Sequence, residues 1–457
     1  MEEKRYLKWY NKIGYGQGDI AGNAVYAFIN SFVMIYLTDT VGLNVGIIGT
    51  LIMLSKFADG LSDIIFGRLM DKTKTKMGKA RPWMLYSYFG NAAALIMLFT
   101  IPSSLGEKAQ YAYFFIAYTM LNAVFYTANN ISYGCLTALV TKNGNERVQM
   151  GSIRYIFSMT TNIVVSYVTI GLVTKLGGGA AGWRNVAILY AVIGIISNTI
   201  AVFAVKELPQ EELEDRNSEK QEDHQAPSFL EALKIVFTNK YYFVMVCIYV
   251  LMYVNSAIKG GAGTYFMTYI FRDTSLLGTF SLAFRLPTLL GMVFTPFLVK
   301  KFRGMYKVNF VGNLCSVLFL AGYVAAGYMR NVPLMLAMLA AGAFMASPLT
   351  GTLNALVAAA ADYTYRKDGK RIDGMRFSCS SFGAKIGSGL GTAISGWLLS
   401  AGGYVANAAQ QPDSAIRMLN VMYLWIPFAV AILLSILTYL MKVEKANADW
   451  DREHVNQ

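Results

Sequence analysis

Apolar segments long enough to cross a lipid bilayer follow one another along nearly the whole chain. A transmembrane helix needs ~20 predominantly apolar residues. Hydrophobic residues make up 55% of the chain and charged residues 15%, whereas about 25% of the residues of a soluble protein are charged. The pattern predicts an all-α membrane protein with twelve transmembrane helices, near residues 12–38, 44–70, 83–103, 110–140, 151–175, 184–206, 238–270, 275–299, 306–329, 333–361, 373–401 and 416–441.

A polar, acid-rich stretch, ELPQEELEDRNSEKQEDHQAPS, separates the sixth span from the seventh. It lacks the aliphatic residues needed for a core and predicts a flexible linker, with a short helix at 229–236. Two six-helix bundles around a linker are the layout of the major facilitator fold, whose halves are pseudo-symmetric. We therefore expect a bundle at 1–206, a cytoplasmic linker at 207–237, a second bundle at 238–441 and a cytoplasmic tail at 442–457.

Lysine and arginine gather in alternate loops. The chain has 40 basic and 27 acidic residues, and in membrane proteins the loops rich in Lys and Arg are cytoplasmic. The N-terminal segment, the loop at 72–81 and the C-terminal tail all belong to the basic set. This predicts a multi-pass protein of the cytoplasmic membrane with both termini in the cytoplasm, and it explains the basic residues without a nucleic-acid partner.

Residue types that carry enzyme chemistry are few. The two histidines, His224 and His454, lie in the linker and the tail, and the sequence contains neither a phosphate-cradling loop nor a metal-ligand cluster. All four cysteines lie in apolar segments, which implies no disulfide framework. We expect a protein that is not an enzyme and needs no cofactor.

Two aspartates stand four residues apart in the second span. At 3.6 residues per turn, Asp59 and Asp63 lie on one helix face, with Ser62 and Lys56 on or near it. A lone charge at the bilayer centre costs at least ~2.5–3 kcal/mol, so two carboxylates kept together indicate a bound cation, such as Na⁺, or a proton relay. The alternative is an internal salt bridge between Lys56 and one aspartate.

The same stretch continues into a strongly basic turn. Gly67-x-x-x-Asp71 is followed by four lysines and Arg81, which predicts a short cytoplasmic loop between two membrane helices. We expect Asp71 and Arg81 to hold the cytoplasmic side closed in the outward-facing state through helix-end and ion-pair contacts.

Polar side chains interrupt the first and fourth spans as well. Asp19 and Asn23 share one glycine-rich face, which favours a cavity over lipid, although Asp19 could instead neutralise a nearby Lys or Arg. In the run FYTANNISYG, Asn130 and Tyr133 indicate a polar ligand lined by amides and a ring face. Joining helices is the commoner role of a single amide.

Four cations stand in or at the ends of membrane spans. Arg154 opens the fifth predicted span; its guanidinium suits a carboxylate or two sugar hydroxyls, but an Arg near a helix end can also snorkel. Lys385 lies deep in the eleventh span, among glycines that allow close helix contact. Lys259 and Arg285 are weaker candidates, which we interpret as structural.

Six stretches along most of the chain form a specific combination, although each is weak alone. They are YGQGDIAGN at 15–23, YLTDTVGLNVGIIGTL at 36–51, the D-x-x-x-D of Asp59 and Asp63, GRLMDKTKTKMGKARPW at 67–83, NNISYGCL at 129–136 and DYTYRKDGKRIDGMRFSCSSFGAKIGSGLG at 362–391. Taken together, they resemble the glycoside–pentoside–hexuronide:cation symporter family.

The resemblance implies a set of site residues. The cation site corresponds to Asp59, Ser62, Asp63 and Thr127. Arg154 and Lys385 match the sugar site, where Asn23 and Asn130 replace two carboxylates of the melibiose branch; Asp19 and Tyr133 complete the substrate residues we expect. Asp362 begins DYTY where the family usually has DYGE, and joins Asp71 and Arg81 in the expected cytoplasmic gate.

These features predict symport of a glycoside, pentoside or hexuronide with Na⁺ or H⁺, by a monomer whose partners are the sugar and the bilayer. An excess of positive charge from Arg154 and Lys385 favours an anionic sugar, whereas neutralisation by Asp19 or Asp373 favours a neutral one. The alternatives are efflux of an amphipathic compound by the same fold and a membrane sugar sensor without transport.

Overall fold

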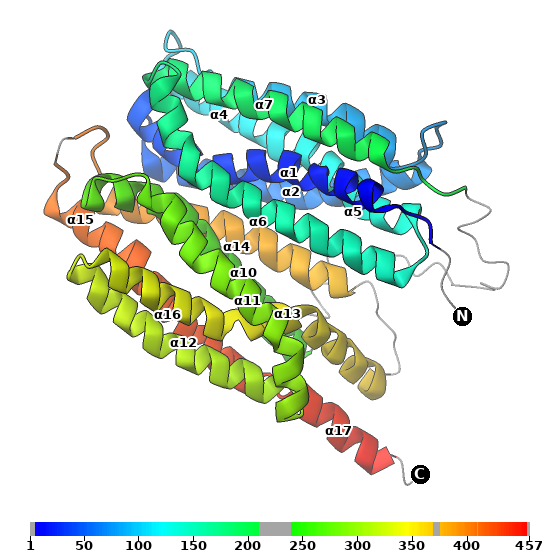
Figure 1. Cartoon of the computed structure of the whole chain (residues 1–457). Helices are drawn as coiled ribbons and strands as arrows, with labels where there is room; N and C mark the ends of the chain where they lie inside the picture. Colours follow the sequence, from blue (N-terminus) through cyan, green and yellow to red (C-terminus); the bar gives the residue numbers. More distant parts are fainter. Residues whose placement is uncertain (1–4, 210–238, 369–374, 409, 455–457) are drawn as a thin grey trace. The chain divides into compact units, whose positions relative to one another are not determined.

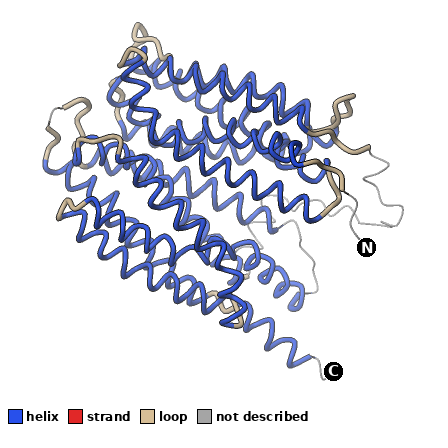
Figure 2. Tube along the Cα trace, viewed as in Figure 1, coloured by secondary structure: helices blue, strands red, loops and turns tan. Residues whose placement is uncertain are grey.

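The computed structural model describes residues 5–209, 239–368, 375–408 and 410–454. The described chain is helical almost throughout, and its only β-pairing is an isolated bridge between Thr75 and Gly78 (Figure 2). The predicted all-α membrane fold is confirmed. The predicted helix at 229–236 and Asp373 lie outside the described residues.

Each predicted span coincides with a helix or a continuous run of helices (Figure 1). Four runs contain a π-helical turn, labelled η. In the first half the elements are α1 (Trp9–Ile35) with η1 (Tyr36–Val41), α2 (Val45–Lys72), α3 (Arg81–Leu98), α4 (Glu107–Thr119) with η2 (Met120–Tyr126) and α5 (Thr127–Val140), α6 (Gly144–Lys175) and α7 (Gly179–Ala204).

The second half repeats the pattern and adds a terminal helix. Its elements are α10 (Lys240–Phe266) with η3 (Met267–Phe271), α11 (Leu276–Phe302), α12 (Met305–Tyr328), α13 (Val332–Asp368), α14 (Met375–Ala401), and α15 (Asp413–Asn420) with η4 (Val421–Trp425) and α16 (Ile426–Leu440), followed by α17 (Val443–His454). Among the described residues, eight of the helical segments are long and apolar enough to cross a membrane by themselves. The positions of the twelve predicted spans thus coincide with helices, while apolarity alone accounts for eight.

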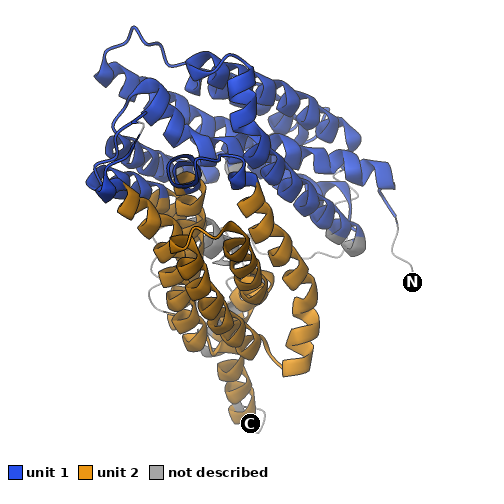
Figure 3. Cartoon of the chain, turned by 60° about the vertical axis from the view of Figure 1, so that its left-hand side comes forward, with its two compact units in different colours: residues 1–220, 263–278, 392–415 blue, residues 221–262, 279–391, 416–457 orange. Residues whose placement is uncertain are grey.

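The described helices form two compact units, which Figure 3 distinguishes by colour. Unit 1 comprises residues 1–220, 263–278 and 392–415, and unit 2 comprises 221–262, 279–391 and 416–457. The predicted halves differ from these units because two second-half segments, 263–278 between α10 and α11 and 392–415 between α14 and α15, with the adjoining helix ends, pack with unit 1. The six-helix bundles and the linker boundaries remain a prediction.

A buried core holds the helices of unit 1 together. In unit 1, α1 packs against α6 and α7, and α3 packs against α7. Tyr15 of α1, Met84 of α3, and Tyr133 and Leu136 of α5 belong to one buried apolar cluster. This packing brings the polar faces of α1, α5 and α6 together.

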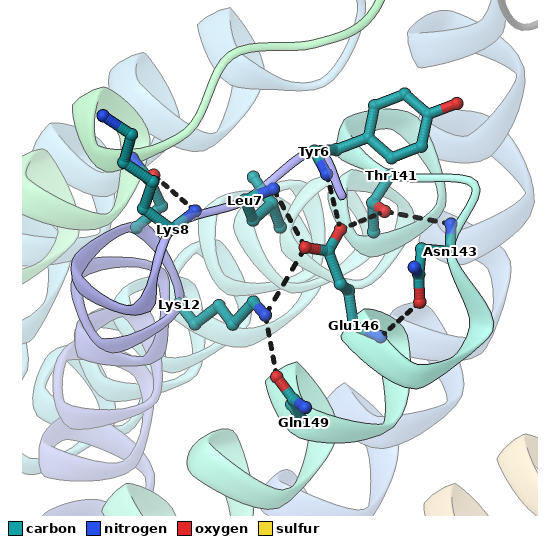
Figure 4. A network of polar contacts seen from close by, with 9 residues as sticks. Tyr6, Leu7, Lys8, Lys12, Thr141, Asn143, Glu146 and Gln149 are labelled. Atoms are coloured by element: carbon teal, nitrogen blue, oxygen red, sulfur yellow. Dashed lines mark hydrogen bonds and ion pairs between the residues drawn. The ribbon is translucent and has the colours of Figure 1, made fainter. Parts of the chain in front are cut away.

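The start of α1 is fixed to the start of α6 by Glu146 (Figure 4). Its carboxylate accepts hydrogen bonds from the backbone N–H groups of Tyr6, at 3.2 Å, and Leu7, at 3.0 Å, and from the Thr141 hydroxyl at 2.7 Å. The Nζ of Lys12 lies 3.4 Å from the Oε1 of Glu146. Because the two helices are tied at the same end, residues about ten positions into each can meet.

Glutamates close two corresponding helix N-termini, one in each unit. Glu207, just after α7, accepts from the N–H groups of Lys79, Ala80 and Arg81 at 2.7–2.9 Å, where α3 begins. Glu444, in the first turn of α17, accepts from Met305 and Tyr306 at 3.0 and 2.9 Å, where α12 begins. Such N–H groups lack a partner within the helix, so the carboxylate satisfies them and complements the helix dipole.

Gly78 makes the first of these contacts possible. Its φ is +108°, and a Cβ at this position would lie 2.3 Å from the carboxyl carbon of Glu207. A larger residue would therefore be strained in its backbone and would also displace the capping carboxylate.

Within unit 2, α14 packs closely against α10, and α17 is joined to α13. Gly383 and Gly387 of α14 lie against α10, where a Cβ would meet Tyr249 or the Val250 carbonyl at 2.5–2.6 Å; close contact at these glycines is confirmed. The predicted tail is a helix, α17, whose Asp451 pairs with Arg366 of α13 through two bonds of 2.9 and 3.0 Å.

Candidate substrate and cation site

An ion pair lies at the centre of the polar face between α1 and α6. The Nε of Arg154 lies 2.8 Å from the Oδ2 of Asp19, and their side chains are 26% and 13% exposed. The Tyr133 hydroxyl donates to the same carboxylate oxygen at 2.7 Å, and the guanidinium lies 4.0 Å from the centre of the Tyr133 ring. Three predicted substrate residues thus form one cluster, in which Asp19 is 114 positions from Tyr133 and 135 from Arg154 in the chain.

The environment of Arg154 differs from the prediction in one respect. We expected Arg154 to open its helix, but α6 begins at Gly144, so Arg154 stands nearly three turns inside it. Snorkelling from a helix end does not apply at this depth. The alternative in which Asp19 neutralises a nearby arginine is the one that the geometry realises.

Asn23 lies one turn further along α1 and is held by α6. Its Oδ1 accepts from the Ser158 hydroxyl and from the Asn162 amide, both at 2.9 Å. Its own amide donates to the Asp19 carbonyl at 2.9 Å. Ser158 and Asn162 were absent from the predicted site, although their spacing of four and eight residues from Arg154 places all three on one face of α6.

Gly18 allows this face of α1 to approach α5. A Cβ at Gly18 would lie 2.7 Å from the Tyr133 ring. The Tyr15 hydroxyl donates to the backbone carbonyl of Tyr133 at 2.6 Å, and the Tyr15 and Tyr133 rings pack with centroids 4.7 Å apart. The tyrosine is therefore fixed in the orientation that presents its hydroxyl to Asp19.

A second cluster joins α2 to the fourth predicted span. The Thr127 hydroxyl lies 2.7 Å from the Oδ1 of Asp59, and Lys56 Nζ lies 3.8 Å from its Oδ2. Lys56 is also 3.5 Å from the Oδ1 of Asn122. The predicted alternative, a salt bridge between Lys56 and one aspartate, is present, and Thr127 joins the same carboxylate.

The other two predicted cation ligands lie on the same helix. Asp63 follows Asp59 by one turn of α2. The Ser62 hydroxyl lies 2.8 Å from the backbone carbonyl of Asp59, so it is directed along its own helix. In the described part of the chain, three or more Asp, Glu, His or Cys side chains do not gather at any point that could hold a metal ion.

The two asparagines of the fourth span have different environments. Asn129 is buried and donates to the Met84 carbonyl at 2.8 Å and to Asn198 at 3.1 Å, so it joins helices. Asn130, the predicted substrate residue, is exposed. Sequence alone could not distinguish these neighbours because adjacent helix positions point about 100° apart and either could face inward.

The remaining cationic candidates, Lys385, Lys259 and Arg285, all lie in unit 2. Lys385 belongs to α14 within unit 2. Lys259 lies with its Nζ 4.7 Å from the centre of the Phe284 ring, and Arg285 lies 3.2 Å from the Ser281 hydroxyl.

The predicted cytoplasmic gate is described in part. Arg81 Nε donates to the Val202 carbonyl at 2.8 Å, and its backbone is capped by Glu207. Asp362 is exposed on α13, and the side chain of Asp71 lies outside the described set. The gate therefore remains a prediction.

Comparison with known proteins gives a consistent result. A family model described as MFS/sugar transport protein matches residues 14–445. The chain is 29% identical to the isoprimeverose transporter of Lactiplantibacillus pentosus, over 99% of this chain and 94% of that protein. It is 24% identical to the putative glycoside/cation symporter YagG of Escherichia coli (strain K12), over 97% and 94%. The crystal structure of a D-xylose-proton symporter matches with a TM-score of 0.65 at 14% identity, covering 94% of this chain and 96% of that one, which shows likeness of fold.

Proposed function

The chain belongs to the MFS/sugar transport protein family, and from this premise we propose that it moves a sugar or glycoside across the cytoplasmic membrane in symport with Na⁺ or H⁺. Membership makes it a membrane transporter and not an enzyme. The names of its relatives, an isoprimeverose transporter and a putative glycoside/cation symporter, support the proposed substrate class and the coupling.

The observation that carries the proposal is the presence of two separate polar clusters on one helix. Thr127, in the cluster of Asp59, and Tyr133, in the cluster of Asp19, both belong to α5. They are six residues apart, about 9 Å along a helix axis. A cation at the first cluster and a sugar at the second would therefore act on the same rigid element.

The charge of the second cluster bears on the kind of sugar. Arg154 is paired with Asp19 at 2.8 Å, so the two charges balance. A balanced cluster with the Asn23 amide beside it suits hydroxyl groups, which accept from a guanidinium and donate to a carboxylate. We therefore propose a neutral glycoside or pentoside as the substrate in preference to a hexuronide.

The first cluster is suited to a coupling cation. Asp59 already lies beside the Lys56 ammonium, and Asp63 adds a second carboxylate one turn away. Two neighbouring carboxylates repel one another, so binding Na⁺ or a proton relieves the repulsion. Movement of the units between two states would then couple cation and sugar, as in alternating access.

The test is uptake of a labelled glycoside into liposomes that contain the purified protein, with an inward Na⁺ gradient, an inward H⁺ gradient or neither. Wild type should accumulate sugar above equilibrium only with the coupling gradient. The Asp63→Asn variant should still exchange labelled for unlabelled sugar but should fail to accumulate it.

A matched control is Ser55→Ala, because Ser55 is a buried residue of α2 whose hydroxyl accepts from Thr119 and lies in neither cluster. It should accumulate sugar like wild type. Full gradient-driven accumulation by Asp63→Asn would disprove the assignment of the cation site. Exit of sugar against a gradient in wild type would instead indicate efflux.

A further inference from the structure

The ends of the first and seventh predicted spans are built in the same way. Each finishes in a π-helical turn, η1 and η3, followed by a left-handed residue, Gly42 at φ 88° or Arg272 at φ 56°. In both, the N–H of the next residue donates to a carbonyl six positions back, Leu37 or Met267, at 2.9 and 3.1 Å. Single π-helical turns of this kind are frequent at functional sites.

The two turns meet at corresponding positions within unit 1. Asp39 and Tyr269 each stand three residues before the left-handed residue. The Tyr269 hydroxyl donates to the Oδ2 of Asp39 at 2.5 Å. Thr264, one turn before η3, donates to the Ser31 carbonyl of α1 at 2.6 Å, so the two helix ends are bonded at more than one level.

A third segment, after α14, joins the same carboxylate. The Tyr404 hydroxyl donates to the Oδ1 of Asp39 and lies 2.9 Å from the Tyr269 hydroxyl. The Asn407 amide donates to the Asp39 backbone carbonyl. Three stretches that are far apart in the sequence, all in unit 1, thus converge on one acidic residue.

The surroundings make these contacts strong. Thr38 donates to Asp39 at 2.8 Å and lies 2.9 Å from the Tyr265 hydroxyl, and both Thr38 and Tyr265 are almost fully buried. The Tyr404 ring packs edge-on against Tyr265 and Tyr269, with centroids 5.1 and 5.7 Å apart. Hydrogen bonds to a carboxylate are stronger than those between neutral groups, and burial strengthens them further.

We propose that Asp39, Tyr269 and Tyr404 form a latch that closes this end of unit 1 and must open in every transport cycle. The predicted topology places the end of the first span on the outer face of the membrane, opposite the basic loops. All of the latch bonds run from hydroxyl or amide groups to Asp39, so water can replace each of them when the segments separate. The proposal goes beyond the proposed function, which assigns no role to Asp39.

The latch can be tested without sugar or cation. A cysteine is placed at Ser31 of α1, about two turns before Asp39, in a background in which Cys135, Cys247, Cys315 and Cys379 are replaced by serine. Reaction with a membrane-impermeant maleimide added from outside is followed in right-side-out vesicles. Asp39→Asn and Tyr269→Phe should each raise the reaction rate about tenfold, the change expected for loss of one hydrogen bond to a charged group.

Matched controls distinguish a latch, whose contacts open during transport, from a static brace, whose contacts only stabilise the fold. Tyr190→Phe removes a buried tyrosine hydroxyl of unit 1 that lies 2.8 Å from Thr169, and it should leave the rate unchanged. The double variant Asp39→Asn, Tyr269→Phe should react about as fast as Asp39→Asn alone, because the bond that Tyr269→Phe removes is one of those that Asp39→Asn already weakens. Tyr404→Phe provides a third, milder variant if Asp39→Asn does not fold.

The outcomes are distinguishable from those of the proposed function. Unchanged labelling in folded Tyr269→Phe and Tyr404→Phe would overturn the latch, as would a lower unfolding temperature with unchanged labelling, which would identify a brace. Either result leaves gradient-driven sugar uptake intact. Conversely, a wild-type protein that takes up no sugar would contradict the proposed function, and the labelling experiment would still test the latch because it uses no sugar.

Discussion

In unit 1, Lys56 and Arg154 each lie beside an aspartate, at 3.8 and 2.8 Å. In unit 2, Lys259 lies over the Phe284 ring, and within the described part of that unit it has no carboxylate partner. Yet both units use the same glutamate cap, Glu207 or Glu444, at a corresponding helix N-terminus. The comparison indicates that a shared scaffold holds cations in different ways, beside a carboxylate at Lys56 and Arg154 and over an aromatic ring at Lys259.

The largest expected effect comes from breaking the charge pair of unit 1. Arg154→Gln leaves the Asp19 carboxylate without its cation, and breaking a buried pair costs about 3–5 kcal/mol. The partial exposure of both side chains reduces this to about 2–3 kcal/mol in the free energy of unfolding. Sugar uptake should fall at least about tenfold, the loss expected when one hydrogen bond of about 1.5 kcal/mol between the guanidinium and the sugar is removed.

Competition between a glucuronide and its uncharged glucoside sharpens this prediction. The glucoside should compete better in wild type, because Arg154 is already balanced by Asp19. The double variant Asp19→Asn, Arg154→Gln should recover stability relative to Arg154→Gln. A glucuronide preference that is present in wild type and lost in Arg154→Gln would show that Arg154 binds a substrate carboxylate.

The second effect concerns Glu146 and depends on pH. Burial acts to raise the pKa of Glu146, but hydrogen bonds from Thr141, Leu7 and Tyr6 outweigh it and lower the pKa below its ordinary value. Hydrogen bonds to a charged group contribute about 1–3 kcal/mol to the free energy of unfolding. This contribution is present above the ordinary Glu pKa of about 4.3, and it is lost as the pH falls through the lower pKa that Glu146 has in the folded protein.

Thermal unfolding in detergent at pH 3 to 7 measures this effect. Glu146→Gln should be less stable than wild type at pH 7, and the difference should shrink below about pH 4 as the wild-type carboxylate is protonated. A difference that stays constant over this range would show that the charge of Glu146 does not contribute.

The caps give a direct comparison of the units. Glu207→Gln and Glu444→Gln should each cost about 1 kcal/mol, the usual value of a helix cap with a favourable dipole contact. Glu207 accepts from three N–H groups and Glu444 from two, so the loss in unit 1 should be the greater. Denaturation of wild type and both variants measures the free energy of unfolding of each. A greater loss of this free energy in Glu444→Gln than in Glu207→Gln would contradict the ranking.

The smallest effect is expected at Lys259. Its contact with the Phe284 ring is worth about 0.5–2 kcal/mol, so Lys259→Met should change the free energy of unfolding by about 1 kcal/mol or less and leave sugar uptake close to wild type. Phe284→Leu serves as the matched control. A loss of uptake as large as that of Arg154→Gln would place substrate chemistry in unit 2 as well.

Much of this architecture could be predicted from local pattern. The run of apolar segments determines the helical membrane fold and the positions of the spans. The spacing of Asp59 and Asp63 determines that they share a helix face, and Lys56 follows from the same periodicity as the partner in a salt bridge. In each case the interacting residues belong to one helix, so the period of 3.6 residues is sufficient.

Contacts between helices were decided only by the tertiary structure. Asp19 and Arg154 were both candidates, but their pairing over 135 positions depends on the rotation and register of α1 against α6. Asp39, Tyr269 and Tyr404 lie in three segments whose sequences show no sign of a common site, and the π-helical turns that direct two of them are set by packing. Apolar periodicity encodes which face of a helix is buried, but many helix rotations and shifts bury a similar area, and the choice among them rests on side-chain packing between distant segments.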